Sequence, residues 1–351
     1  FLIYLTTSPD FALDSYRVDA FDYLLKPVES ELFFQSLDKA YRSFSQIMQK
    51  TAVVWFGALI CCALWGSAFP CIKIGYQMFE IDAADTAAQI LFAGYRFTLA
   101  GILTVLIGSV LNKGFLIPKK ESLGKIFKLS MLQTVLQYFF FYVGLANTTG
   151  VKASIIEGVN VFVAVLVASL LFQQEKLTGK KIVGCLIGFA GVVIVNLGGS
   201  MDMGFRLTGE GFIFLSTVAY AFSSVFLKRY SKDENPVLLS GYQFITGGII
   251  MCVIGLLMGG KVHGFAAAST GMLVYLAVVS AVAYSLWGIL LKYNPVSKVA
   301  VFGFMNPVFG VILSALLLGE GAQAAGVKSL IALLLVSIGI YVVNKKEGDS
   351  V

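Results

Sequence analysis

Two charged residues stand inside long apolar stretches, where a charge needs a partner or a polar cavity. Arg96 lies in Ala88–Leu111 and Glu157 in Val151–Phe172. If both stretches are membrane-crossing helices, both charges lie about 10 Å below the same surface at 1.5 Å per residue. The two could form a structural ion pair, or a binding site in which Arg96 takes a carboxylate and Glu157 an amine. Alternatively, Glu157 could carry a proton, or the two side chains could make no contact.

Other polar and aromatic side chains in the apolar stretches could line the same cavity. Asn160 lies three residues after Glu157, on the same helix face, and Asn306 stands in a later stretch. Aromatic rings often line apolar cavities, and the rings placed within the stretches are Trp65, Tyr138, Tyr220, Tyr284 and Trp287. Each residue also has a structural interpretation: an interhelical hydrogen bond for the asparagines, and packing or interfacial anchoring for the rings.

Two lysines begin apolar stretches, and the usual catalytic and cofactor motifs are missing. Lys152 and Lys298 could attract anionic groups at the two mouths of a passage, or simply extend to the membrane surface. Five scattered cysteines and the single His263 cannot assemble a common zinc site. No phosphate-binding or nucleophile motif is present. We therefore expect no metal, no cofactor and no enzymatic activity.

The composition predicts the elements that position these residues. Of the 351 residues, 58% are hydrophobic and 13% are charged, against about 25% charged in a soluble domain. A soluble enzyme and a nucleic-acid binder are therefore poor interpretations, and a lipid bilayer is the expected surrounding. A crossing helix needs about 20 apolar residues. Ten stretches qualify: Ala52–Ile74, Ala88–Leu111, Ile126–Ala146, Val151–Phe172, Ile182–Leu197, Gly209–Leu227, Val237–Met258, Gly271–Leu291, Val299–Leu318 and Ala324–Val343.

The distribution of lysine and arginine predicts the orientation of these helices, because cytoplasmic loops carry the excess of basic residues. The even-numbered loops and the C-terminal tail carry most of the basic side chains, whereas the odd-numbered loops carry few. The first odd loop instead carries Glu80, Asp82 and Asp85. We therefore expect a multi-pass protein of the cytoplasmic membrane with both termini in the cytoplasm.

The sequence repeats itself at an offset of about 147 residues. The segment Gly94-Tyr95-Arg96-Phe97 recurs as Gly241-Tyr242-Gln243-Phe244. Lys152 and Asn160 recur as Lys298 and Asn306, each pair eight residues apart, and Trp65 and Lys73 match Tyr220 and Lys228 at the same spacing. Each repeat holds five helices, and an odd number inverts the second copy in the membrane. Inverted repeats are typical of secondary transporters.

Several segments resemble the EamA-type family of the drug/metabolite transporter superfamily. They include "LWGSAFPCIKIG", "GYRFTLAG", "GLANTTGVKASIIEGVNVFVAVLVASLLFQQEKL", "GKKIVGCLIGFAGVVIVN" and "SKVAVFGFMNPVFGVILSALLLGE". The resemblance covers residues 48–346, with one repeat over 48–198 and the other over 207–346. It departs at Val161, where the family often has proline, as at Pro307.

This resemblance implies an all-α membrane protein that moves a small organic solute, such as an amino acid, a metabolite or a drug. We expect a secondary exporter that works by alternating access, with protons as a possible coupling partner, as a monomer or a homodimer. An importer or exchanger of the same family is the first alternative, and a membrane sensor is the second.

Residues 1–47 differ in kind from the rest. The segment "LIYLTTSPDFALDSYRVDAFDYLLKPV" resembles the C-terminal part of a response-regulator receiver domain, in which Thr6 and Lys26–Pro27 match positions beside the phosphorylation pocket. We expect strands at Phe1–Leu5 and Tyr23–Leu25, and helices at Phe11–Arg17 and Ser30–Phe44. The acidic half of a receiver is missing, so we interpret the segment as a remnant or junction, with a docking role as the alternative.

Overall fold

The computed structural model describes residues 3–8, 20–82, 84–148, 153, 156–196, 205–318 and 327–345. The chain divides into two units, Phe1–Val54 and Trp55–Val351. The expected helix at Phe11–Arg17 and the mouth lysine Lys152 lie outside the described residues.

The N-terminal unit holds two short parallel strands and one helix. Strand β1 (Ile3–Thr6) pairs with β2 (Asp22–Leu25), with Thr6 opposite Leu25. Helix α2 (Ser30–Gln49) follows, and its Ser36 hydroxyl donates a hydrogen bond to Asp22. This bond holds the pKa of Asp22 below its ordinary value. Two strands and the last helix are thus where the sequence predicts them, although the helix runs five residues beyond Phe44.

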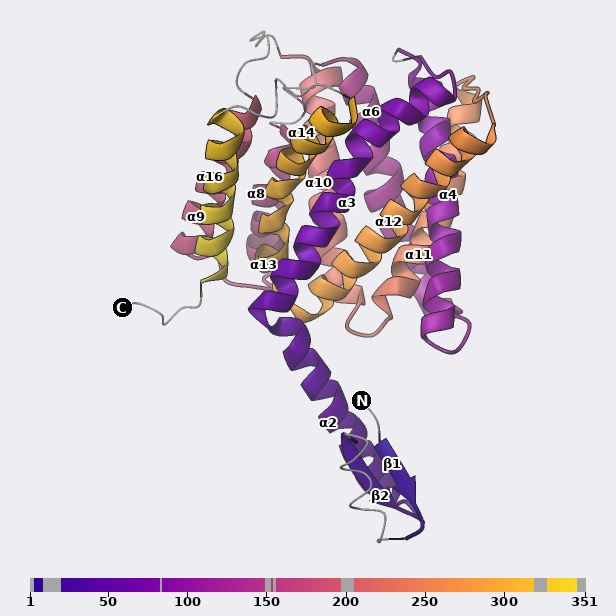
Figure 1. The fold of residues 1–351 in the computed structure, drawn as a ribbon, viewed down its shortest axis with the longest axis vertical. Helices are drawn as coiled ribbons and strands as arrows, with labels where there is room; N and C mark the ends of the chain where they lie inside the picture. The colour runs from indigo at the N-terminus through magenta and orange to yellow at the C-terminus, as the bar shows by residue number, and fades with distance from the viewer. Residues whose placement is uncertain are drawn as a thin grey trace. The chain divides into compact units, whose positions relative to one another are not determined.

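The second unit is a helical bundle (Figure 1). Its helices are α3 (Thr51–Met78), α4 (Thr86–Leu111), α5 (Lys120–Leu129), α6 (Gln137–Ala146), α8 (Asn160–Leu166), α9 (Gly179–Asn196), α10 (Phe212–Tyr230), α11 (Pro236–Leu257), α12 (Ala267–Tyr293), α13 (Val296–Ala300), α14 (Met305–Leu318) and α16 (Val327–Asn344). Three π-helical stretches, η2 (Ser130–Leu136), η3 (Val167–Leu171) and η4 (Leu207–Gly211), and one 3₁₀ turn, η5 (Val301–Phe304), extend or connect these helices.

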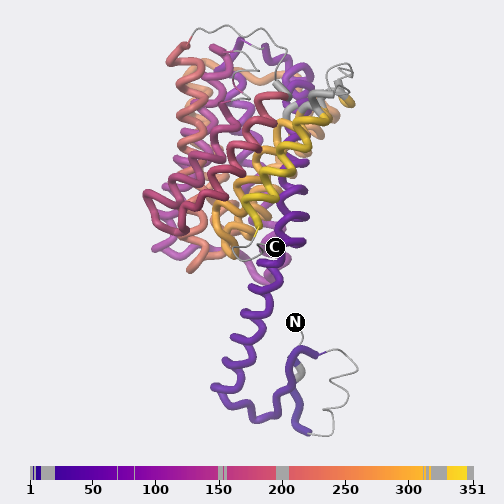
Figure 2. The backbone as a smooth tube through the Cα atoms, turned by 90° about the vertical axis from the view of Figure 1, so that its left-hand side faces the viewer, coloured from indigo at the N-terminus to yellow at the C-terminus, as the bar shows by residue number. Residues whose placement is uncertain are grey.

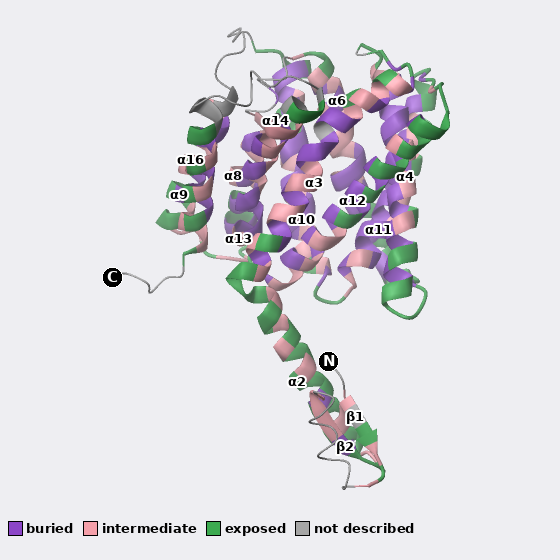
Figure 3. Ribbon diagram, viewed as in Figure 1, coloured by how far each residue is buried: buried purple, intermediate pink, exposed green. Residues whose placement is uncertain are grey.

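Within the described residues, six helical segments are long and apolar enough to cross a membrane. They are Thr51–Met78, Thr86–Leu111, Lys120–Ala146, Leu207–Tyr230, Pro236–Leu257 and Ala267–Tyr293. They coincide with the first, second, third, sixth, seventh and eighth expected helices. Shorter apolar helices at Ile156–Leu171, Val296–Gly310 and Leu330–Asn344 fall on three more, and α9 falls on the fifth. Large apolar residues are exposed along these helices, as expected for surfaces that face lipid. Figure 3 shows the exposed positions in green.

Helices α4 and α11 form the most extensive helix contact of the bundle, and glycines make it possible. Asp85 caps the start of α4, and Asn235 with Pro236 begins α11. A Cβ atom on Gly101 would lie 2.6 Å from the Gly241 carbonyl oxygen, and one on Gly248 would lie 2.4 Å from the Thr98 nitrogen. The two backbones therefore approach more closely than any side chain would allow.

A second close pair, α9 and α16, lies at the left-hand side of the bundle in Figure 1, the side that faces the viewer in Figure 2. Here the glycines are Gly184, Gly188 and Gly339, and a Cβ atom on Gly339 would lie 2.6 Å from the Gly184 carbonyl oxygen. Each of these two tight pairs joins a helix of residues 48–198 to a helix of residues 207–346. These close contacts at glycines thus hold the two parts of the bundle together.

Candidate functional site

An aromatic cluster occupies the interior of the bundle, between α3, α6 and α12. The Tyr138 and Tyr284 hydroxyl oxygens lie 2.7 Å apart in a hydrogen bond. The Trp65 ring packs edge-on against Tyr284 at 5.1 Å and against Trp287 at 5.0 Å between ring centroids. Tyr284 and Trp287 are 3% and 2% exposed. Four of the five aromatic residues predicted from the sequence therefore meet in one place.

Two phenylalanines missed by the sequence analysis connect this cluster to Arg96. Phe97 packs against Tyr138 at 4.4 Å between ring centroids and is stacked on Phe244 at 5.3 Å. Phe244 in turn packs edge-on against Tyr284 at 4.9 Å. The Arg96 guanidinium carbon lies 5.2 Å from the centre of the Phe97 ring. Arg96 is therefore part of the same interior cluster, which we call the aromatic core.

Arg96 is buried without a carboxylate partner among the described residues. It is 3% exposed, and its Nε donates to Ser280 Oγ at 3.1 Å and to the Leu276 carbonyl oxygen at 3.3 Å, both on α12. Arginine carries five N–H donors, and the Nη groups form no hydrogen bond to any described residue. A buried guanidinium held by one nitrogen leaves its planar fork available to an anionic group.

The contacts of the aromatic core recur between residues about 147 positions apart. Arg96 donates a hydrogen bond to Ser280. Gln243, the residue of the second repeat that matches Arg96, accepts a hydrogen bond from Thr134 at 2.7 Å. Thr134 stands 146 positions before Ser280 and is therefore its match in the first repeat. Tyr138 and Tyr284 are 146 positions apart and bond to each other. Phe97 and Phe244 are 147 positions apart and stack on each other. The offset of the repeat was the signal that could have predicted Thr134, Ser280 and the two phenylalanines.

Arg96 and Glu157 form no ion pair among the described residues, so the structural ion pair is not seen, and the roles of the two residues in binding a solute or carrying a proton stay predictions. Glu157 is half-buried in the helix that begins at Ile156. Among the residues that the structure describes, Asn160 and Asn306 make no hydrogen bond to each other, and the buried Asn306 Oδ1 atom has no hydrogen-bond partner. Lys298 lies in α13. Tyr220 is 9% exposed on α10 and shares no ring contact with Tyr284 among the described residues.

The counterpart of Glu157 is Gly303, and the two helices that carry them do touch. A Cβ atom on Gly303 would lie 3.4 Å from Val161, and Phe162 packs edge-on against Phe304 at 6.3 Å between ring centroids. Glu157 and Asn160 therefore lie on a helix that contacts the segment bearing Asn306. This places the three polar residues on neighbouring elements.

The Tyr138–Tyr284 hydrogen bond gives a direct test of the aromatic core. We expect Tyr138→Phe and Tyr284→Phe each to lower the free energy of unfolding by about 1 kcal/mol, the range of hydrogen bonds between membrane helices. The double variant should lose no more than either single variant, because one bond is lost in each case. Tyr242→Phe removes a separate hydrogen bond of 2.9 Å to the Leu116 carbonyl oxygen. Its loss of unfolding free energy should therefore add to that of either variant. Denaturant unfolding in detergent measures the free energy of unfolding of the three single variants and the double variant. A double variant whose loss equals the sum of the losses of Tyr138→Phe and Tyr284→Phe would contradict the bond.

The fold and the interior define the class of this protein: a helical membrane protein with a buried arginine and an aromatic core. The profile of the EamA-like transporter family matches residues 52–197 and again residues 207–345. The chain therefore belongs to the EamA-like transporter family, whose members are transporters and not enzymes. The resemblance stated from the sequence segments is confirmed at the level of the family.

Individual relatives agree with this assignment. The chain is 27% identical over 299 residues to an uncharacterized transporter of Archaeoglobus fulgidus, covering 84% of this chain and 99% of the relative. It is 25% identical over 301 residues to the uncharacterized inner membrane transporter YedA of Escherichia coli K12, covering 83% and 93%. A protein of known crystal structure shares the fold, with a TM-score of 0.68 at 17% identity over 83% of this chain and 96% of that chain.

Proposed function

We propose that this chain is a secondary transporter of the cytoplasmic membrane that moves a small organic solute outward. Two inverted five-helix repeats, residues 48–198 and 207–346, would alternate around the aromatic core, and both termini would lie in the cytoplasm. The recurrence of contacts at an offset of 146 or 147 residues supports the paired repeats. Amino acids, metabolites and drugs are the candidate solutes, and protons are the candidate coupling ion.

The observation that carries this proposal is the Arg96 guanidinium in the aromatic core. Its Nη groups are available to a carboxylate or another anionic group of the solute. The rings of Trp65, Phe97 and Tyr138 offer apolar surface to the body of the same molecule. We therefore expect a solute with an anionic group and an apolar or aromatic body.

Export from overexpressing cells tests the proposal and identifies the solute. Cells that overproduce the chain should release at least one organic acid or amino acid faster than cells carrying an empty vector. The same solute should accumulate in inverted membrane vesicles, and collapse of the proton gradient separates proton coupling from exchange. Vesicles that take up no member of a broad anionic and zwitterionic panel, at equal protein content, would contradict the proposed function.

Glu157 is the second candidate in the transport path. We expect Glu157→Gln to abolish transport while the amount of protein in the membrane stays unchanged, because the substitution removes the charge and keeps the size of the side chain. Uptake into vesicles, normalised to protein content, measures the effect. Intact transport would show that Glu157 neither binds the solute nor carries a proton.

The receiver-like segment gives a further prediction, since we propose that residues 1–47 are a remnant without a role in transport. The chain that begins at Met48 should transport the solute at the rate of the full chain. Compared at equal membrane content, loss of transport on this truncation would instead favour a sensor in which the segment is coupled to the helices.

A further inference from the structure

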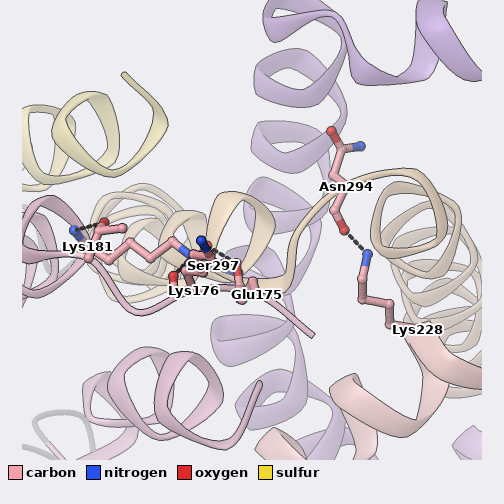
Figure 4. A network of polar contacts seen from close by, with 7 residues as sticks. Glu175, Lys176, Lys181, Lys228, Asn294 and Ser297 are labelled. Atoms are coloured by element: carbon pink, nitrogen blue, oxygen red, sulfur yellow. Dashed lines mark hydrogen bonds and ion pairs between the residues drawn. The ribbon is translucent and has the colours of Figure 1, made fainter. Parts of the chain in front are cut away.

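The short connection between α12 and α13 is held by a lysine from a neighbouring helix. Lys228, near the end of α10, donates to the Leu291 carbonyl oxygen at 3.0 Å and to the Asn294 carbonyl oxygen (Figure 4). The carbonyls at the end of a helix have no partners within it, and a positive charge there is favourable. Lys228 thus fixes the end of α12 to α10.

A glutamate holds the same connection from the other side. Glu175, in the segment between η3 and α9, accepts hydrogen bonds from the backbone N–H of Ser297, at 2.9 Å, and from the Ser297 hydroxyl group. The Lys181 Nζ atom, at the start of α9, forms an ion pair with Glu175 Oε2 at 2.8 Å. The Glu175 side chain is 6% exposed. Charge-assisted bonds of this kind are stronger than neutral ones. Glu175 thus fixes the start of α13.

The Glu175 anchor joins the two parts of the chain that match the family profile, whereas the Lys228 anchor lies within the second part. Glu175 and Lys181 belong to residues 52–197, whereas Lys228, Asn294 and Ser297 belong to residues 207–345. The 3₁₀ turn η5 separates α13 from α14, and α13 is only five residues long. The anchored piece is therefore a short segment that could move apart from the helix that follows it.

The counterpart of this lysine at the other end of the bundle is not engaged. Lys73 occupies the position that matches Lys228 in the repeat, eight residues after Trp65 as Lys228 is eight residues after Tyr220. Lys73 is exposed and forms no hydrogen bond or ion pair with the described residues. Among the described residues, a lysine therefore holds the backbone at the α12–α13 connection, and the matching lysine at the opposite end holds none.

We propose that the bonds between Glu175 and Ser297 are a latch that closes this end of the bundle and must open in each transport cycle, with Lys228 holding the connection that presents Ser297. The inference rests on the proposed function, because alternating access requires the two repeats to separate at one end at a time. The latch sets which end is closed in the state without solute. By the loop-charge argument, that end faces the cytoplasm.

Hydrogen–deuterium exchange of the full chain in lipid nanodiscs, without any solute, tests the latch. In Glu175→Ala and in Lys228→Met, amides of Val296–Ala300 should exchange at least about ten-fold faster, as expected from loss of a charge-assisted hydrogen bond. Two matched variants should leave this exchange unchanged. Lys73→Met removes the unengaged counterpart, and Glu234→Gln alters an ion pair with Lys125, at 3.3 Å, that does not touch α13.

The exchange rates test the latch without any transported solute, so failure of the latch can be told apart from failure of the proposed function. Faster exchange confined to the two latch variants supports the latch, whether or not a transported solute is found. Unchanged exchange in both variants, or equal acceleration in the matched variants, overturns it. If Glu175→Ala does not yield folded protein, Glu175→Gln and Lys228→Met carry the same test. Once a solute is known, turnover in the latch variants should change at least about three-fold, and unchanged turnover would overturn a role in the cycle.

Discussion

Replacing Arg96 with glutamine is expected to reduce transport about 10- to 100-fold, with the protein still present in the membrane at normal amounts. Hydrogen bonds to a charged group contribute about 1.5–3 kcal/mol, and each 1.4 kcal/mol corresponds to a factor of ten. Glutamine is already the residue at the matching position 243, which is fully buried. The substitution therefore removes the charge with a side chain that such a position accepts. Initial rates of uptake into vesicles, at equal protein content, measure the loss.

Stability provides the control for this variant. A buried charge without a carboxylate partner costs free energy, so Arg96→Gln should leave the melting temperature unchanged or raise it. Arg96→Lys keeps the charge but lacks the planar fork, and we expect it to recover only part of the transport. Transport by Arg96→Gln within two-fold of the unmodified chain would show that the guanidinium does not contact the solute.

The largest expected effect on stability comes from Gly248→Ala. The added Cβ would lie 2.4 Å from the Thr98 nitrogen and 3.0 Å from the Gly94 carbonyl oxygen. Both are backbone atoms of α4, so the clash can be relieved only if α4 and α11 separate. Overpacking of this kind costs about 1–3 kcal/mol or more. We expect the melting temperature in detergent to fall by about 5 °C.

Gly271→Ala is the matched control for this glycine. Gly271 is also helical, in α12, but a Cβ atom there would have no neighbour within 4 Å. Alanine favours a helix over glycine by up to about 1 kcal/mol, so this variant should melt at the same temperature or higher. Equal melting of the two variants would show that α4 and α11 do not depend on their close approach.

The elements were largely predictable because apolar length is a direct physical requirement of the bilayer. The six long helices coincide with predicted ones, although their ends moved. The third begins at Lys120 rather than Ile126, because the helix continues through the polar residues that precede the apolar stretch. The eighth extends to Ala267 and Tyr293 for a similar reason. Periodicity and hydropathy identify the buried middle of a helix but not where its hydrogen bonding ends.

The candidate site was predictable in its residue types and less so in its contacts. Trp65, Tyr138, Tyr284 and Trp287 meet because rings on neighbouring helices fill one interior. No ion pair between Arg96 and Glu157 is present among the described residues, because similar depth in the membrane does not fix the direction in which each side chain points. Ser280, which holds Arg96, carries no signal of its own in an apolar helix and could be found only through the repeat offset.

The contacts between Tyr138 and Tyr284 and between Phe97 and Phe244 have a consequence for how this sequence can change over time. At both places a residue contacts the residue at the equivalent position of the other repeat. A substitution at one of the two positions therefore changes what the other position tolerates. A bulkier ring at 97 needs a smaller one at 244, and loss of the hydroxyl at 138 removes the reason to keep it at 284. Related sequences should therefore show coordinated substitutions between sites 146 or 147 positions apart.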